Sequence, residues 1–332
     1  MNSFSKIAVT GASGHLGNTV CRVLLERGFS VNAFFNSDKK ALHDLSVNAT
    51  QGSVLNPENL SDLMHGCDAV IHCAAVISIN GDPTGIVHKT NTEGPKNIAE
   101  VSKKLGIKKI IHVGSVHAVL EHPLNSLFDE TRPHKQPGSY AYDYSKACGE
   151  QLVFGITKNS QTEAVVVRPS LIIGPYDFKP SEIGKVLLDY YHNRLPAITA
   201  GGYNFIDVRD VANSIVEALE KGRNGEIYHL TGKYYTLKNL SEAVKKVTGK
   251  KVPEMPVPFW LLNMSLPFFR LQSRLNGAAP VLTREALHAL KYGHTNMVNA
   301  KAQRELRHSF RPLEESIADY YEWQKMRKVI IS

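Results

Sequence analysis

Lys6-Ile-Ala-Val-Thr10, followed by Gly11-Ala-Ser-Gly14-His-Leu-Gly17, is the stretch of the chain that decides its fold. The first five residues predict a strand, and the pattern from His15 to Gly28 predicts a helix closed by its last glycine. Glycine between a strand and a helix permits positive φ and close approach of a ligand, while the helix N-terminus offers free N–H groups to an anion. The spacing is G-x-x-G-x-x-G, which differs from the commonest dinucleotide fingerprint, G-x-G-x-x-G. The residues predicted to bind the phosphates of a dinucleotide are Gly11, Ser13, Gly14, His15, Leu16 and Gly17.

Strand and helix patterns alternate through the rest of the first half of the chain. Such alternation requires right-handed crossovers and gives a parallel sheet with helices on both faces. The sequence therefore predicts an α/β fold of the Rossmann type, a doubly wound parallel sheet. The predicted strands are Lys6–Thr10, Ser30–Phe35, Ala49–Gly52, Ala69–Cys73, Lys108–Gly114 and Ala164–Arg168, and the predicted helices are His15–Gly28, Pro57–His65, Asn91–Gly106 and Tyr140–Ile156.

The regular alternation of strand and helix patterns ends after Gly174, which predicts a smaller C-terminal substrate lobe. We assign residues 1–175 to a dinucleotide-binding domain, with returning segments near 203–232, and residues 176–332 mainly to the substrate lobe. Five prolines between Lys251 and Pro280 predict short helices and turns there. Further predicted elements are helices at Ser181–Asn193, Val211–Lys221, Leu237–Thr248 and Leu313–Arg327, and a strand at Ile227–Leu230 that returns to the sheet.

Composition excludes several classes of protein. The 332 residues are 42% hydrophobic and 21% charged, as in ordinary globular proteins, and the net charge of +8 is scattered in lysine pairs, so we expect no nucleic-acid partner. Four cysteines without a C-x-x-C pair, and no secretory leader before Ile7, favour the reducing cytoplasm. The apolar stretch Phe259–Phe269 is too short for a membrane span, and no histidine cluster indicates a metal. The chain is expected to be a monomer or a homodimer.

Tyr142 and Lys146 form the first candidate catalytic pair. Their i, i+4 spacing places both side chains on one helix face. A phenol with a pKa near ~10 carries protons poorly at neutral pH, and a neighbouring ammonium favours the phenolate. Ser115 follows the fifth predicted strand, at the sheet edge where ligands bind, and is expected to orient a substrate oxygen. We predict Ser115, Tyr142 and Lys146 as the catalytic residues.

Together these features resemble the extended branch of the short-chain dehydrogenase/reductase superfamily, over nearly the whole chain. The resemblance is also carried by Asp68–Ala75, Asn91–Gly94, Arg168–Pro175, Asn204–Ala212 and Arg311–Glu315. It implies a structural role for the asparagine at 91. It further implies that the cofactor is contacted by Ser53, Val54, Ala74, Ala75, Tyr142, Lys146, Pro169 and Leu171. One departure is Gly52-Ser53, where the family often has Gly-Asp to bind adenine.

The choice of cofactor depends on the residues after the second strand. An acid there selects NAD, whereas a base accepts the 2′-phosphate of NADP. At the position of the family's frequent arginine stands Asn36, and the bases that follow are Lys39 and Lys40. We therefore predict cofactor contacts for Asn36 and Lys39 and a preference for NADP(H) over NAD(H).

The resemblance also separates the subclasses of this branch. Ser115-Val-His117 stands where nucleotide-sugar dehydratases have Thr-Asp-Glu, and Leu171 stands where epimerases typically have an asparagine near the diphosphate. Val166–Pro175 resembles dihydroflavonol-reductase-like and hydroxysteroid-dehydrogenase-like enzymes. We expect an NAD(P)-dependent oxidoreductase acting on an apolar, ring-containing or small carbonyl substrate. A nucleotide-sugar epimerase and a non-catalytic NADP-binding redox sensor stay open as alternatives.

The substrate pocket is predicted less directly. Aromatic residues follow the sixth strand, where the body of a substrate should lie, and one histidine follows the candidate serine. The basic residue nearest to this region, Arg209, is expected either to bind a substrate phosphate or to form an ion pair with Asp207 or Asp210. The predicted substrate-binding residues are His117, Tyr176, Phe178 and Arg209.

Overall fold

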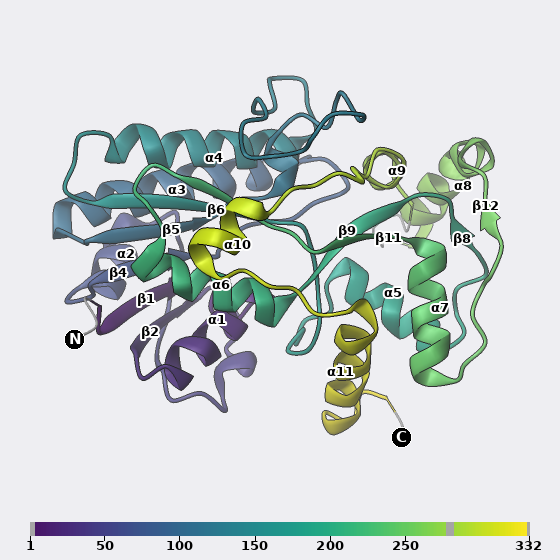
Figure 1. The fold of residues 1–332 in the computed structure, drawn as a ribbon, viewed down its shortest axis with the longest axis horizontal. Helices are drawn as coiled ribbons and strands as arrows, with labels where there is room; N and C mark the ends of the chain where they lie inside the picture. The colour runs from purple at the N-terminus through teal and green to yellow at the C-terminus, as the bar shows by residue number, and fades with distance from the viewer. Residues whose placement is uncertain (1–3, 277–281, 331–332) are drawn as a thin grey trace.

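The computed structural model describes residues 4–276 and 282–330 and contains a seven-stranded, wholly parallel sheet (Figure 1). The strand order is β10-β6-β5-β4-β1-β2-β3, with the reversal between β1 and β4 that marks a ligand crevice in doubly wound folds. The predicted Rossmann-type fold is confirmed, including the returning strand β10. The strands are β1 (Lys6–Thr10), β2 (Ser30–Phe35), β3 (Asn48–Gln51), β4 (Ala69–His72), β5 (Lys109–Val113), β6 (Glu163–Pro169) and β10 (Ile227–Leu230).

Helices cover both faces of this sheet, so its central strands are apolar on both sides. Ile7 and Val9 of β1 pack toward one face, and Ala8 between them packs toward the other. The first face carries α1 (His15–Glu26), α6 (Val208–Lys221) and α10 (Ala300–Leu306). The second face carries α2 (Pro57–Met64), α3 (Ile86–Leu105) and α4 (Ala141–Thr157).

A second core lies beyond the carboxyl edge of the sheet. Leu187, Tyr190, Leu240 and Ile317 are among its buried side chains. Three short strands in the order β11-β9-β7 and a pair β12-β8 accompany it, and none of these five strands was predicted. The elements are β7 (Leu171–Ile173), α5 (Glu182–Tyr191), β8 (Ile198–Thr199), β9 (Gly202–Asp207), β11 (Lys233–Thr236), α7 (Leu237–Thr248), β12 (Pro256–Val257), α8 (Phe259–Asn276), α9 (Arg284–Lys291) and α11 (Leu313–Met326), with single 3-10 turns η1 (Lys40–Leu42) and η2 (Val116–Ala118).

The prediction of short helices and turns between Lys251 and Pro280 is wrong for most of that segment. Phe259–Asn276 is one helix of 18 residues, and 277–280 lie outside the described residues. Pro258 precedes the helix and its carbonyl accepts from the N–H groups of Leu261 and Leu262, so it helps to start the helix. Only Pro267 lies inside.

Helix α6 begins at Val208, three residues before its predicted start. The carboxylate of Asp207 accepts the N–H of Arg209 and caps the helix there.

Two helix glycines test the packing of the turn between β1 and α1, one within the packed region and one outside it as a control. A Cβ added to Gly17 in α1 would clash with the carbonyl oxygen of Gly11, whereas one added to Gly155 in α4 meets nothing. We expect Gly17→Ala to lower the free energy of unfolding by about 1–3 kcal/mol through overpacking. We expect Gly155→Ala to raise it by about 0.5–1 kcal/mol through helix propensity. Denaturant titration measures both, and equal effects of the two substitutions would contradict this packing.

Candidate active site

The turn between β1 and α1 fits a pyrophosphate. Gly11 has φ +67°, and a Cβ there would lie 2.7 Å from the backbone nitrogen of Ala74, so this glycine and Gly17 close the turn. Gly14 is exposed, and its own added Cβ would meet only the Gly11 carbonyl, at 3.2 Å. No side chain in the described part of the chain caps the N-terminus of α1. The first N–H groups of the helix, at His15 and Leu16, are therefore available to an anion.

Most of the remaining predicted cofactor residues follow the carboxyl ends of parallel strands, and so lie at one edge of the sheet. Asn36 and Lys39 follow β2 and are exposed, and the Asp38 carboxylate between them accepts the N–H of Lys40 at 2.9 Å. The others are distributed in the same way: Ser53 and Val54 after β3, Ala74 and Ala75 after β4, Pro169 at the end of β6 and Leu171 at the start of β7.

Ser53 occupies the position where the family often has an aspartate. Its N–H donates to Oδ1 of Asn59 at 3.3 Å, and its hydroxyl oxygen accepts the N–H of Leu55 at 3.2 Å. The hydroxyl keeps its own proton to donate, so hydrogen bonding to an adenine remains chemically open at this position.

The three predicted catalytic residues meet at the end of β5. Ser115 follows this strand, and its buried hydroxyl hydrogen-bonds the phenol of Tyr142, the second residue of α4. Burial raises the pKa of Tyr142 to about 12, and the Ser115 hydrogen bond opposes this rise. The phenol is therefore protonated at neutral pH and can donate a proton to a substrate oxygen.

Lys146 lies one turn further along α4 and is 4% exposed. Its ammonium donates to the carbonyl oxygen of Val113 at 2.6 Å. Burial lowers the pKa of Lys146 to about 8, while the Glu150 carboxylate acts to raise it. Lys146 was expected to lower the pKa of the Tyr142 phenol. Burial of Tyr142 raises this pKa instead, and burial is the larger effect.

A buried ion pair, which sequence reasoning missed, lies beneath the lysine. Glu150 of α4 and Arg168 of β6 are both fully buried, and the guanidinium donates to the two carboxylate oxygens at 2.7–3.2 Å. His134 Nε2 lies 3.0 Å from the same carboxylate. A Cβ at position 114 would clash with Oε1 of Glu150, so Gly114 is required for this carboxylate to fit under the strand end. The i+4 spacing from Lys146 was the available sequence signal.

A polar wall lies in front of the phenol. The ring of His117 is 6.4 Å from that of Tyr142, edge to face, and its Nδ1 is 3.5 Å from the carboxylate of Asp143. Lys135 bridges Asp143 and Glu121, and Glu121 in turn is 3.6 Å from His288 of α9. The predicted His117 is thus at the site, whereas Glu121, Lys135 and His288 are additional residues that only the folded chain brings there.

The other predicted substrate residues make contacts of their own. The ring of Tyr176 lies beneath Arg22 of α1 and edge-on to Trp323 of α11, and Phe178 also packs against Trp323. Arg209 pairs with Asp207 and with Asp319. No hydrogen bond, ion pair or ring contact between described residues joins Tyr176, Phe178 or Arg209 to Tyr142. Gly174 and Tyr176, which precede Phe178, both have positive φ values.

Asn91 has the structural role that the resemblance implied. Its amide exchanges two hydrogen bonds of 2.9 Å with the backbone of Val76 and donates to Ser145 of α4 at 3.0 Å. In the described parts of the chain, no group of three potential ligands is placed to hold a metal. None of the described helices combines the length and the apolar character that crossing a membrane requires.

Comparison with known proteins agrees with this geometry. The sequence pattern of the NAD dependent epimerase/dehydratase family matches residues 7–231. Sterol demethylase protein B of Methylococcus capsulatus is 31% identical over 75% of this chain and 76% of its own, and a putative dihydroflavonol 4-reductase of Synechocystis is 31% identical over 76% and 75%. The crystal structure of gox2253 has a TM-score of 0.84 at 30% identity, over 97% of this chain and 98% of its own.

These similarities confirm the resemblance drawn from the glycine turn and the tyrosine–lysine pair, and with it the prediction of an NAD(P)-dependent oxidoreductase. The chain belongs to the NAD-dependent epimerase/dehydratase family, within the extended branch of the short-chain dehydrogenase/reductase superfamily.

Proposed function

We propose that this protein is a ketone or aldehyde reductase that uses NADPH and acts on apolar carbonyl substrates. The observation that carries the proposal is the meeting of Ser115, Tyr142 and Lys146 at the end of β5, on the same sheet edge as the glycine turn. Residues 1–175 would hold the dinucleotide, with the segments near 203–232, and residues 176–332 would supply most of the substrate lobe.

The proposed roles follow from chemistry that the side chains can perform. When bound, the nicotinamide cofactor supplies the hydride. Tyr142 donates its phenolic proton to the substrate oxygen during reduction and accepts it back in the reverse direction. Ser115 donates a hydrogen bond that orients the same oxygen. The ammonium of Lys146 stabilises the phenolate that remains after proton transfer.

Apolar substrates are favoured by two considerations. The named relatives include a sterol demethylase protein and a putative dihydroflavonol 4-reductase. Leu171, where an epimerase would need a group that bonds a diphosphate, presents only an aliphatic side chain, and Arg209 is occupied by two carboxylates. These features disfavour the nucleotide-sugar epimerase alternative, and the complete Ser–Tyr–Lys set disfavours a redox sensor without catalysis.

The finer properties are proposals as well. Lys39 and Lys40 would favour NADP(H), because no described residue pairs with their exposed ammonium groups. Four free cysteines suit the reducing cytoplasm. A monomer or homodimer without a nucleic-acid partner suits a small-molecule reductase.

The first test is a substrate panel. We expect net consumption of added NADPH with apolar ketones or aldehydes, and no saturable binding of nucleotide sugars by calorimetry. Tyr142→Phe should lower turnover by about 10²-fold or more, because the proton donor is lost, while dinucleotide affinity persists.

Tyr144→Phe is the matched control for this test, since Tyr144 lies two residues further along the same helix. The activity of this variant should equal that of the wild type. Tight binding of a nucleotide sugar without net oxidation of NADPH would favour the epimerase instead. Full turnover by Tyr142→Phe would remove the proposed proton donor.

The second test concerns cofactor choice. A charge-assisted hydrogen bond to phosphate contributes about 1.5–3 kcal/mol, or roughly ten- to hundredfold in affinity. We expect NADPH to bind more tightly than NADH by this factor, and the double variant Lys39→Ala/Lys40→Ala to lose most of the difference. Lys103→Ala/Lys104→Ala, at the far end of α3, should keep it. Equal affinities of the wild type for the two cofactors would refute the preference.

The third test uses pH. Because the proposed mechanism needs the ammonium form of Lys146, kcat/KM should fall as pH rises through the lysine's pKa of about 8. Glu150→Gln removes a carboxylate that raises this pKa, so the fall should move to lower pH. The exposed Glu220→Gln should leave the profile unchanged. Melting curves check that each variant is folded, and a folded Glu150→Gln enzyme with the wild-type profile would contradict this role.

A further inference from the structure

One face of α8 is apolar and exposed. Trp260, Met264 and Phe268 are 65%, 70% and 65% exposed, and Leu261 is exposed beside them. At 3.6 residues per turn these four side chains fall within an arc of about 100°. Leu266, on the opposite side of the helix, is 4% exposed. We call these four residues the α8 stripe.

The four residues of the α8 stripe are not the ones that attach this helix to the rest of the protein. The ring of Phe259 approaches the backbone at Gly201, and α8 lies beside α9 at the end of the molecule remote from the N-terminus (Figure 1). The side chains of the described residues leave the stripe open to solvent. An exposed patch of large apolar side chains on one helix face indicates a binding surface.

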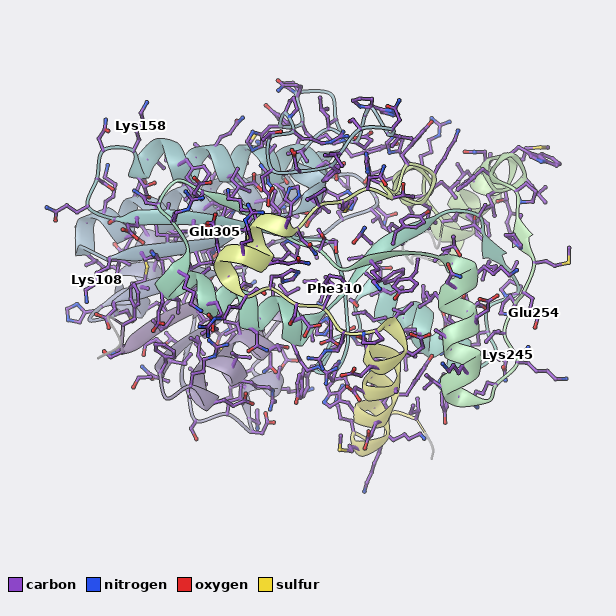
Figure 2. All side chains as sticks on the ribbon, viewed as in Figure 1. Lys108, Lys158, Lys245, Glu254, Glu305 and Phe310 are labelled. Atoms are coloured by element: carbon purple, nitrogen blue, oxygen red, sulfur yellow. The ribbon has the colours of Figure 1, made fainter. Side chains whose placement is uncertain are left out.

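The sequence that forms α8 and leads into it carries a net positive charge. Residues 237–276 contain seven lysines and arginines and two acidic residues, so this segment carries five of the eight net positive charges. The two acids, Glu242 and Glu254, are each paired with a lysine of α7, Lys238 and Lys245. Figure 2 shows Lys245 and Glu254 at the same end of the molecule as α8.

This combination selects one kind of partner. Two copies of the chain brought together through this face would bring two positive segments together, which opposes self-association. An anionic lipid surface instead attracts the lysines and takes up the apolar side chains, and tryptophan is favoured at such an interface. None of the described helices is long and apolar enough to span a bilayer, so a contact of this kind lies along its surface.

We propose that the α8 stripe docks the protein on an anionic lipid bilayer. The proposal goes beyond the proposed reductase activity, because lipid binding is measured without turnover. It also places α9 between the lipid surface and the catalytic wall, since His288 of α9 approaches Glu121 there. An apolar substrate dissolved in the bilayer would then be close to the lobe that receives it.

The two tryptophans of the chain provide the test. Trp260 belongs to the α8 stripe, whereas Trp323 is 7% exposed on α11. Vesicles of phosphatidylcholine mixed with phosphatidylglycerol should shift the emission of Trp260 to shorter wavelength, and brominated phosphatidylcholine in them should quench it. Trp260→Phe, which keeps only Trp323, should show neither effect. Vesicles of phosphatidylcholine alone should bind more weakly.

Cosedimentation with the same vesicles gives the affinity. Met264→Glu should weaken binding by about tenfold or more, because it places a charge in the apolar contact. Met326→Glu, at an equally exposed methionine on α11, should not. Melting curves confirm that both variants fold.

Three results would overturn the proposal. They are an absence of binding to either vesicle, equal binding by Met264→Glu and the wild type, and a wild-type dimer in sedimentation that Met264→Glu abolishes. The last of these would identify a second copy of the chain as the occupant of the stripe.

Discussion

Glu150 and Arg168 have lost all contact with solvent, and neither can remain there without the other. Removing one partner from a buried ion pair leaves an uncompensated charge, which costs several kcal/mol in typical proteins, about 3–5. The pair joins α4 to β6, across the end of β5 where Gly114 leaves room for the carboxylate. Because Tyr142 and Lys146 occupy the preceding two turns of α4, the same ion pair fixes where the catalytic side chains stand relative to the sheet.

The glycine turn and the tyrosine–lysine pair depend on one geometric property of the fold. All strands of the large sheet are parallel, so every loop that follows a strand emerges at the same edge. Residues more than a hundred positions apart, such as Gly14 and Ser115, therefore border a common site. The glycines of the first turn have two different roles. Gly11 and Gly17 permit close packing, whereas Gly14 leaves a backbone surface open to a ligand.

Much of this arrangement was predictable from local pattern. Period-2 and period-3.6 hydrophobicity predicted the strands and helices of the sheet, and strand ends predicted where Ser115 would lie. The Glu150–Arg168 pair was not predicted, because a glutamate in a helix and an arginine at a strand end look like surface residues until the two elements are packed together. The packing of Tyr176 and Phe178 against Trp323 was not predicted either, and the positive φ of Tyr176 is a conformation that sequence patterns do not indicate. The length of α8 was not predicted, because a proline-rich segment indicates short helices and turns, whereas only Pro267 lies inside this helix.

The clash between a Cβ at position 114 and the carboxylate of Glu150 extends to the way this chain can change over time. A substitution of Gly114 is tolerated only if position 150 first becomes shorter, and a shorter residue at 150 leaves the Arg168 guanidinium without its acceptor. Positions 114, 150 and 168, separated by up to 54 places in the sequence, therefore constrain one another's substitutions. In an alignment of relatives they should vary together or not at all, and an engineer who alters the strand end to reshape the pocket must alter all three at once.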